Sequence, residues 1–158
     1  MPKLSVSLEE MMPLILERLA AGEEVQFTPR GTSMRPMIYG GRDHVVLSPL
    51  KGKLKKFDIP LYRRDDGHYV LHRIVKVGET YTMVGDNQYQ KEPGIRQDQL
   101  LAVVSAFVRD GKRYHVTDPS YRAYYLFWYY SRPIRRCIRV ANKSPRRLFG
   151  KENKERSE

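Results

Sequence analysis

The hydrophobic residues near the start of the chain recur at the spacing of an amphipathic helix. Ser7-Leu8-Glu9-Glu10 forms a capping-box pattern at its start, and Gly22 provides a natural stop. Pro13 lies inside this helix and is expected to kink it. The apolar face consists of Leu8, Met11, Met12, Ile15 and Leu19. We therefore predict that residues 1–23 contain a helix that packs on the body of the protein.

From Glu24 onward the hydrophobic pattern changes to the alternation that is typical of β-strands. Turn signals, such as Asp65-Asp66-Gly67 and Asp110-Gly111, separate short runs of strand-forming residues. The predicted strands cover residues 25–28, 44–47, 59–64, 68–77, 80–84, 100–109 and 112–116. Residues 24–118 are thus predicted to form a mostly β domain, and the flanking helices make the whole chain α+β.

A third region begins at Asp118-Pro119, where an N-cap residue precedes a proline that suits the first helical position. The helix predicted here is rich in aromatic residues, and Pro133 interrupts it. Beyond Asn142 the composition is typical of a disordered segment. Residues 119–158 are therefore predicted to form an aromatic and basic helix with a disordered tail.

The positive charge of the chain is concentrated in this third region. The 158 residues carry a formal net charge of +11. Residues 1–118 contain 18 Lys+Arg against 15 Asp+Glu, a net charge of +3, whereas residues 119–158 contain 11 against 3, a net charge of +8. A basic segment of this kind indicates an anionic partner, either lipid or nucleic acid.

Aromatic residues at helical spacing precede the arginines of this region. Tyrosine and tryptophan favour the membrane–water boundary, and arginine binds anionic headgroups. We therefore predict that the segment lies on an anionic membrane surface, although it could instead pack on the body or bind single-stranded nucleic acid, which is the less favoured partner. The predicted interface residues are Tyr121, Tyr124, Tyr125, Trp128, Arg132, Arg135 and Arg136.

The cysteine count and the hydropathy of the chain exclude several classes of protein. Cys137 is the only cysteine, so an internal disulfide and a cysteine-rich metal site are both excluded, and we expect no cofactor. The sequence shows no signal-peptide pattern and no run of about 18 apolar residues that could span a membrane. We therefore expect a cytoplasmic or peripherally membrane-associated protein.

A serine in a stiff loop is the first candidate for chemistry. Ser33 lies between Gly31, which can take positive φ, and Pro36, which restricts the backbone before it. Such a loop would hold one hydroxyl in place, as a serine nucleophile requires. It is also a common kind of turn, so Ser33 needs support from elsewhere in the chain.

Two later stretches provide that support. The strand Val70–Val75 carries His72 in an apolar setting, and the strand end at Val84 leads into Gly85-Asp86-Asn87. Serine chemistry needs a base within hydrogen-bond reach and a carboxylate that orients the base. All three residue types therefore occur in the order serine, histidine, acid.

Five motifs in the body occur in a recognisable order. They are Gly31-x-Ser33-Met34-x-Pro36, Arg42-Asp43-x-Val45, Phe57-Asp58-Ile59, His72-Arg73-Ile74-Val75 and Gly85-Asp86-Asn87. Together they resemble the boxes of the signal peptidase I family and, more broadly, of the superfamily that includes the LexA-type self-cleaving repressors. The resemblance covers roughly residues 25–108 and implies a mostly β catalytic fold. It also implies an endopeptidase that binds its peptide as an added strand and cleaves after small residues.

The resemblance implies that Ser33 is the nucleophile and His72 the general base. Bacterial signal peptidases and the repressors use a lysine base, whereas the endoplasmic-reticulum and archaeal branch uses histidine. Lys76 shares the face of His72, but four residues along a strand is about 13 Å away, so we reject it as the base. With a histidine base, kcat/KM should rise through an apparent pKa near about 6–7.

Two further roles depend on the same resemblance. Gly31 stands where many signal peptidases carry a hydroxyl, so backbone N–H groups, alone or with Thr32, would hold the oxyanion. In the histidine branch an acid beyond the Gly-Asp-Asn motif supports the base. Glu92 is the favoured candidate by spacing, and Asp86 is its competitor.

The favoured function is therefore a serine endopeptidase with a Ser33–His72 pair, acting on a peptide or preprotein through an acyl-enzyme. A LexA-like regulator that associates with nucleic acid is a second hypothesis, but no helix-turn-helix pattern precedes the body. A third is a peptide-binding module without turnover. The substrate stays open among secreted preproteins, a small modified peptide and the protein's own tail.

Overall fold

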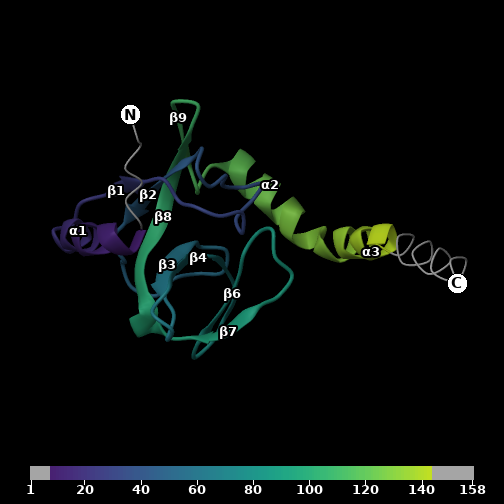
Figure 1. Cartoon of the computed structure of the whole chain (residues 1–158), viewed down its shortest axis with the longest axis horizontal. Helices are drawn as coiled ribbons and strands as arrows, with labels where there is room; N and C mark the ends of the chain where they lie inside the picture. Colours follow the sequence, from purple (N-terminus) through teal and green to yellow (C-terminus); the bar gives the residue numbers. More distant parts are fainter. Residues whose placement is uncertain (1–7, 144–158) are drawn as a thin grey trace, which may run out of the picture. The chain divides into compact units, whose positions relative to one another are not determined.

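Two antiparallel sheets and three α-helices make up residues 8–143, the part of the chain that the computed structural model describes (Figure 1). This mostly β, α+β architecture confirms the predicted class. The predicted cap at Ser7 and the predicted disordered tail from residue 144 onward lie outside the described residues. The elements are α1 (Leu8–Ala20), β1 (Val25–Phe27), β2 (His44–Ser48), β3 (Pro60–Arg63), β4 (Tyr69–Leu71), β5 (Arg73–Val77), β6 (Tyr81–Val84), β7 (Glu92–Ile95), β8 (Leu100–Arg109), β9 (Lys112–His115), α2 (Pro119–Tyr130) and α3 (Arg132–Lys143).

Helix α1 packs on the start of the first sheet, as its sequence predicts. Its buried side is formed by Met12, Ile15 and Leu19, which recur at helical spacing, and the helix contacts β1. Gly22, with a φ of +83°, follows the last turn and lets the chain leave the helix. The prediction that this helix packs on the body is confirmed.

Strands β1 and β4 stand at the two ends of the main strand order of the first sheet. Its strand order is β1-β2-β8-β3-β4, and β9 pairs with the far part of β8. Strand β8, ten residues long, is the spine of the sheet because it pairs with β2, β3 and β9. Asp110 and Gly111 both have positive φ, 51° and 74°, as a tight hairpin turn between β8 and β9 requires.

The chain crosses from the first sheet to the second at His72. The sequence predicts one strand over residues 68–77, and this is wrong: β4 ends at Leu71 in the first sheet, and β5 begins at Arg73 in the second. The second sheet has the order β5-β6-β7. Strand β7 was not predicted because its sequence, Glu-Pro-Gly-Ile, contains the two residues least suited to a strand.

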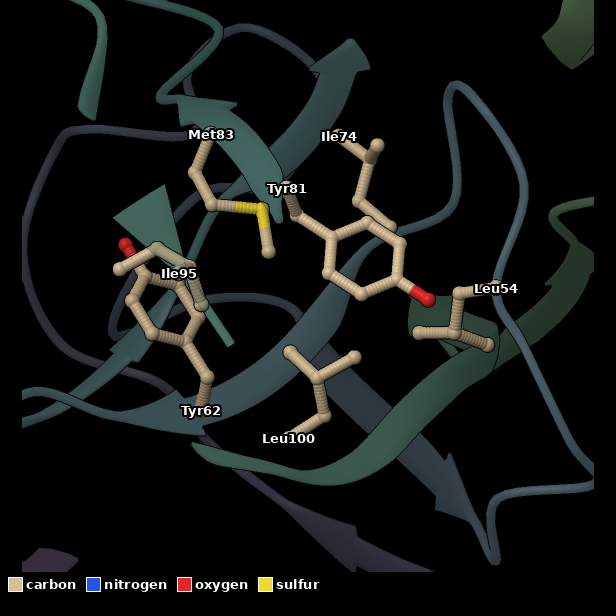
Figure 2. Packing of buried hydrophobic residues seen from close by; sticks show 7 residues of the cluster. All are labelled: Leu54, Tyr62, Ile74, Tyr81, Met83, Ile95 and Leu100. Carbon is tan, nitrogen blue, oxygen red and sulfur yellow. The ribbon is translucent and has the colours of Figure 1, made fainter. Parts of the chain in front are cut away.

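A hydrophobic core fills the space between the two sheets (Figure 2). Each fully buried large apolar side chain stabilises the fold by about 1.5–3 kcal/mol, so this cluster is a major source of stability. Tyr62 of β3 belongs to the cluster and is fully buried, yet it also carries a hydroxyl that needs a polar partner. The members are Leu54, Tyr62, Ile74, Tyr81, Met83, Ile95 and Leu100.

The chain divides into two compact units between Ala123 and Tyr124, within α2. In the second unit α2 ends at Tyr130 and α3 begins at Arg132, so the predicted interruption near Pro133 is confirmed. Pro133 lies in the first turn of α3, where a missing N–H costs no helical hydrogen bond. Within residues 8–143, none of the helices has the length and apolarity needed to cross a membrane.

Candidate active site

Contacts within the loop itself fix the backbone that carries Ser33. Gly31 adopts a φ of +90°, Met34 is buried, and the Ile38 N–H donates to the Met34 carbonyl over 2.9 Å. A Cβ on Gly40 would lie 2.3 Å from the Gly31 carbonyl oxygen, so only glycine allows these two backbone segments to pass so closely. Ser33 itself is partly exposed at the top of this turn.

The Gly85-Asp86-Asn87 motif braces the serine loop from the second sheet. The Asn87 backbone N–H donates to the Ser33 carbonyl over 2.8 Å, and the Asn87 amide donates to the Thr32 carbonyl over 3.2 Å. A Cβ on Gly85 would lie 2.7 Å from the Ser33 carbonyl oxygen. Two motifs that are about fifty residues apart in the sequence are therefore in direct contact.

The braced loop leaves backbone donors near Ser33. Within residues 8–143, the N–H groups of Ser33 and Met34 donate no hydrogen bond. Unpaired N–H groups beside a nucleophile can stabilise the oxyanion that forms when an ester or amide carbonyl is attacked. Thr32 is exposed next to them, and Pro36, which follows a cis peptide bond, is partly buried.

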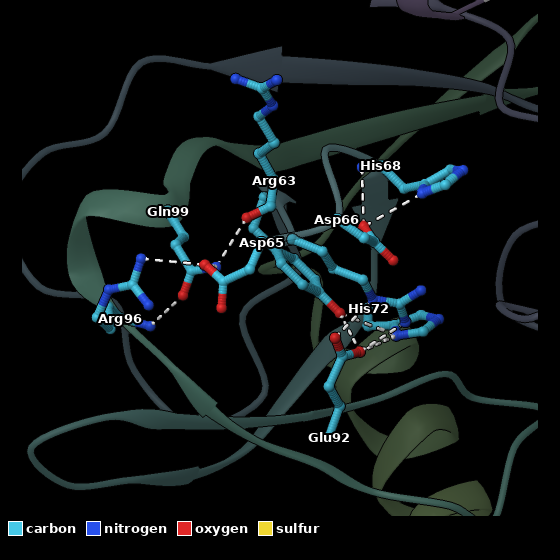
Figure 3. Close-up of polar contacts among 10 residues, drawn as sticks. Arg63, Asp65, Asp66, His68, His72, Glu92, Arg96 and Gln99 are labelled. Atoms are coloured by element: carbon cyan, nitrogen blue, oxygen red, sulfur yellow. Dashed lines mark hydrogen bonds and ion pairs between the residues drawn. The ribbon is translucent and has the colours of Figure 1, made fainter.

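His72 lies at the point where the chain changes sheets, and only 4% of its surface is exposed. Its Nδ1 is 3.2 Å from the Tyr62 hydroxyl and 3.7 Å from Oε2 of Glu92. The Tyr62 hydroxyl in turn donates to Oε2 of Glu92 over 2.7 Å. Figure 3 shows the carboxylate of Glu92 directed at the His72 ring. The favoured pairing of His72 with Glu92 is therefore present, with a tyrosine between them.

An arginine fixes the carboxylate of Glu92. Arg64 donates from Nε to Oε1 over 2.6 Å and from a terminal nitrogen to Oε2 over 2.7 Å, the bidentate geometry that holds a carboxylate most firmly. Burial alone would raise the pKa of Glu92, but the hydrogen bonds from Arg64 and Tyr62 outweigh it and hold that pKa below its ordinary value. Glu92 is therefore ionised at neutral pH and accepts hydrogen bonds only.

These hydrogen bonds determine the tautomer of His72. Burial, reinforced by Glu92, raises the pKa of Tyr62, so its hydroxyl keeps its single proton and donates it to Glu92. The Tyr62 oxygen can then only accept from His72, which places the ring proton on Nδ1. In the neutral ring Nε2 carries the lone pair and makes no hydrogen bond within residues 8–143. Nε2 is therefore the nitrogen that can act as a base.

The acidity of His72 differs from the value expected for an ordinary histidine. Burial lowers its pKa to about 4, and the attraction of Glu92 for the protonated ring offsets only part of this. This pKa lies below the value of about 6–7 expected from the sequence, and the ring is neutral at pH 6–7.

Asp86 occupies a different cluster from the one around His72. Arg73 binds both oxygens of Asp86, from Nε over 2.8 Å and from a terminal nitrogen over 2.7 Å, and it also donates to the Phe57 carbonyl over 3.0 Å and to the Tyr121 hydroxyl over 3.2 Å. Both ionic side chains are almost completely buried. Of the two candidate acids, Glu92 thus lies against His72 and Asp86 against Arg73.

A cleft with a volume of about 310 Å³ lies between the two edges of the first sheet. One wall is the segment from Phe27 to Ser33, which continues β1, and the other is β4, Tyr69–Leu71, which ends directly before His72. Within the described residues no hydrogen bond joins Ser33 to His72. The structure therefore brings the serine loop and β4 to one cleft. His72 directly follows β4 in the chain but is not among the described residues that line the cleft.

Tyr62 and Arg64 were missed by the sequence analysis, although they complete the surroundings of His72. They lie two residues apart, so they point to the same side of the predicted strand 59–64. A tyrosine and an arginine on the same side of one strand were the signal that could have indicated a polar cluster here. Their partner, Glu92, is on β7, whose Pro-Gly sequence conceals the strand.

Two of the predicted membrane-interface residues are buried, so their assignment is corrected. Only 7% of Tyr121 and 7% of Tyr125 is exposed. Tyr121 packs against Phe107, with 5.2 Å between ring centroids, and accepts the hydrogen bond from Arg73. Tyr121 is thus part of the body, as the alternative of a packed face predicts.

Tyr125 and the remaining predicted interface residues lie in the second unit. Tyr124 and Arg136 are exposed, whereas Trp128 is partly covered because the Arg135 guanidinium lies 3.6 Å from the centre of its ring. The Arg132 guanidinium lies 5.1 Å from the Tyr129 ring centre. Their membrane contact stays a prediction.

A scan against protein-family models finds no match for this chain, and a search of curated proteins finds no similar one. Within the described residues, no group of three histidine, cysteine or acidic side chains is arranged to hold a metal ion.

Proposed function

We propose that this protein is a serine endopeptidase in which Ser33 is the nucleophile and His72 the general base. The observation that carries the proposal is the cleft: Ser33 lines one wall, and the other wall is β4, which ends at Leu71, the residue before His72. The resemblance of the five sequence motifs to signal peptidase I supports the same assignment. Since no family model matches, the proposal depends on these residues and their geometry.

The proposed reaction follows from the hydrogen bonds of the site. His72 Nε2 removes the proton from the Ser33 hydroxyl as its oxygen attacks the peptide carbonyl, and the N–H groups of Ser33 and Met34 hold the resulting oxyanion. The protonated ring returns its proton to the leaving amine, which departs and leaves an acyl-enzyme. A water molecule, activated by the same nitrogen, hydrolyses that ester and restores Ser33. Glu92 stabilises the ring while it is charged.

The peptide would bind as an extended strand between the two edges of the sheet. Edge strands present unpaired N–H and C=O groups, and β1 and β4 bring two such edges to the cleft. A strand inserted there would gain backbone hydrogen bonds on both sides and would pass Ser33. The resemblance further implies a small residue before the cleaved bond.

Substitution of Ser33 by alanine tests the proposal directly. Purified wild-type protein and Ser33→Ala would be incubated with a peptide library made from digested cell protein, and new termini would be identified by mass spectrometry. We expect cleavage products with the wild type only, an unchanged circular dichroism spectrum, and normal activity in the control Ser120→Ala, which removes an exposed serine from α2. Equal cleavage by Ser33→Ala would refute the proposal.

A peptide-binding module without turnover is the second candidate, favoured by the lack of a hydrogen bond between Ser33 and His72 in the described residues. Catalytic hydrogen bonds are often absent before substrate binds, so this observation is compatible with both functions. Peptide retention on immobilised wild-type protein without any new termini would indicate the binding module.

A further inference from the structure

The exposed apolar side chains of this protein are concentrated in one short segment. Eight large hydrophobic residues are exposed within the described part of the chain, and six of them lie between residues 124 and 140. Between 46% and 70% of the surface of each of these six is exposed. A concentration of this kind indicates a surface that is covered by a partner. The six residues are Tyr124, Phe127, Tyr130, Ile134, Ile138 and Val140.

Four of these side chains form two pairs, each on one face of its helix. Phe127 and Tyr130 are three residues apart in α2, and Ile134 and Ile138 are four residues apart in α3, so each pair shares a face. Figure 1 shows α3 following directly after α2. We call Phe127, Tyr130, Ile134 and Ile138 the apolar stripe.

Most arginines of α3 lie on a different side of the helix from the apolar stripe. Arg132, Arg135, Arg136 and Arg139 recur at spacings of three and four residues. On a helical wheel Arg132, Arg136 and Arg139 fall on the side away from Ile134 and Ile138, whereas Arg135 lies at the flank, nearer Ile138. From Pro119 to Lys143 the sequence contains six Lys+Arg and no Asp or Glu. The charged residues of α3 are therefore all cationic, and three of its four arginines lie away from the two isoleucines.

This combination fits an anionic membrane surface better than nucleic acid. Nucleic acid could bind the arginines, but it would leave the isoleucines of the apolar stripe in water. The rings of Trp128 and Tyr129, which could stack on bases, are already covered by Arg135 and Arg132. A bilayer interface accepts both sides of the helix, because aromatic and aliphatic groups enter the acyl boundary while arginines bind phosphate.

We propose that residues 124–143 bind the surface of a bilayer containing anionic phospholipid, with the apolar stripe inserted and the arginines on the headgroups. The helices lie in the plane of the interface, since they are too short and too charged to span it. This surface does not include Ser33 or His72, so the proposal is independent of the proposed peptidase activity.

The test uses full-length protein and vesicles of phosphatidylcholine with phosphatidylglycerol at a ratio of roughly 3:1, compared with phosphatidylcholine alone. Trp128 is the only tryptophan, so its fluorescence reports on this segment, and co-sedimentation measures the bound fraction. We expect binding to the mixed vesicles, a change in Trp128 emission, and partial retention of binding in about 0.5 M salt, because apolar insertion is not screened.

Matched double variants distinguish insertion of the apolar stripe from non-specific binding by any exposed apolar residue. Ile134→Ala with Ile138→Ala keeps the helix propensity of α3 and should weaken binding roughly tenfold or more. The control, Leu14→Ala with Val77→Ala, removes the two exposed large hydrophobic residues that residues 8–123 contain and should leave binding unchanged. Arg136→Gln with Arg139→Gln should weaken binding to the mixed vesicles roughly tenfold.

Three results would overturn the proposal. One is a wild-type protein that stays in the supernatant with the mixed vesicles at low salt. Another is an equal loss of binding in the Leu14/Val77 control and the Ile134/Ile138 variant. The third is tight binding of a single-stranded oligonucleotide that displaces the vesicles and is unaffected by the isoleucine changes. Circular dichroism of each variant shows whether the helices are kept.

Discussion

His72 and Arg73 are consecutive in the chain, yet they enter two buried polar clusters with opposite properties. The chain changes sheets at this point, so the two side chains are directed to different sides. Arg73 meets the carboxylate of Asp86 in a bidentate ion pair, and His72 meets the carboxylate of Glu92 through Tyr62. Each cluster thus joins a basic side chain to an acidic one across the interior.

The two clusters differ in how many of their hydrogen-bonding groups are used. Arg73 is only 1% exposed and its donors reach Asp86, the Phe57 carbonyl and Tyr121. In the other cluster Glu92 has a side chain that is 26% exposed, and Nε2 of His72 has no partner within the described residues. A buried pair with all its groups bonded holds the fold together. A cluster with one basic nitrogen left over can transfer a proton.

The largest effect expected from this comparison is on catalysis, in His72→Ala. The rate should fall by roughly three decades or more, since a base and its nucleophile act as one unit. The matched control is His68→Ala, which removes an exposed histidine paired with Asp66 and should leave the rate unchanged. The measurement is kcat on a peptide that the wild type cleaves, and a His72→Ala variant with more than about a tenth of the wild-type kcat would remove His72 from the mechanism.

The largest effect on stability is expected in Asp86→Ala. Removing one partner of a buried ion pair leaves the other charge uncompensated, which costs about 3–5 kcal/mol of the free energy of unfolding. The carboxylate of Asp86 also links Arg73 to the loop that contains Asn87, which braces the serine loop, so this link would be lost as well. Urea unfolding measures the loss. A change below about 1 kcal/mol would show that the Arg73 cluster is not structural.

Glu92→Gln should show the opposite balance. The amide oxygen can still accept from Tyr62 and from the terminal nitrogen of Arg64, but the amide NH2 replaces the oxygen that accepts from Arg64 Nε. The free energy of unfolding should therefore fall by about 1–2 kcal/mol, less than in Asp86→Ala. The charged ring of His72 loses its counter-charge, so kcat should fall roughly 10- to 100-fold. In addition, the pKa of His72 should fall below its wild-type value, because Glu92 raises it.

The pH dependence of the stability follows from the lowered pKa of His72. The pKa of His72 is 6.5 in the unfolded chain and about 4 in the folded protein. The unfolded state therefore holds more protons between these values, and stability falls as the pH drops through this window. NMR titration of the His72 ring measures the folded pKa in both proteins. An unchanged pKa in Glu92→Gln would show that the carboxylate does not act on the ring.

The sequence could name residues of the candidate site, but it could not predict how they are arranged. Ser33, His72 and Glu92 could be named because each stands in a short motif or at a fixed spacing from one. The role of Tyr62 could not, because a tyrosine in a β-strand is usually core, and here it is core as well as a hydrogen-bond donor. The break at His72 was hidden by the continuous strand pattern of residues 68–77, since periodicity carries no information on which sheet a strand joins.

The smallest effect is expected in Tyr62→Phe, which tests whether the Tyr62 hydroxyl sets the tautomer of His72. The ring stays in the core, so only the hydroxyl and its hydrogen bonds are lost, at a cost of about 1–2 kcal/mol in the free energy of unfolding. Arg64 still holds Glu92, but its carboxylate oxygen is 3.7 Å from Nδ1, too far to fix the ring proton there.

A loss of tautomer control would lower the fraction of His72 that carries its lone pair on Nε2, so kcat should fall several-fold, and at most about tenfold, with little change in KM. Nitrogen-15 chemical shifts of the ring distinguish the two tautomers directly: the wild type should show a proton on Nδ1, and Tyr62→Phe a mixture. A purely structural tyrosine would lower stability and leave these shifts unchanged. The control Tyr81→Phe removes a hydroxyl from the same core cluster, where it donates to Gln97 over 2.6 Å, and should lower stability without altering the His72 tautomer.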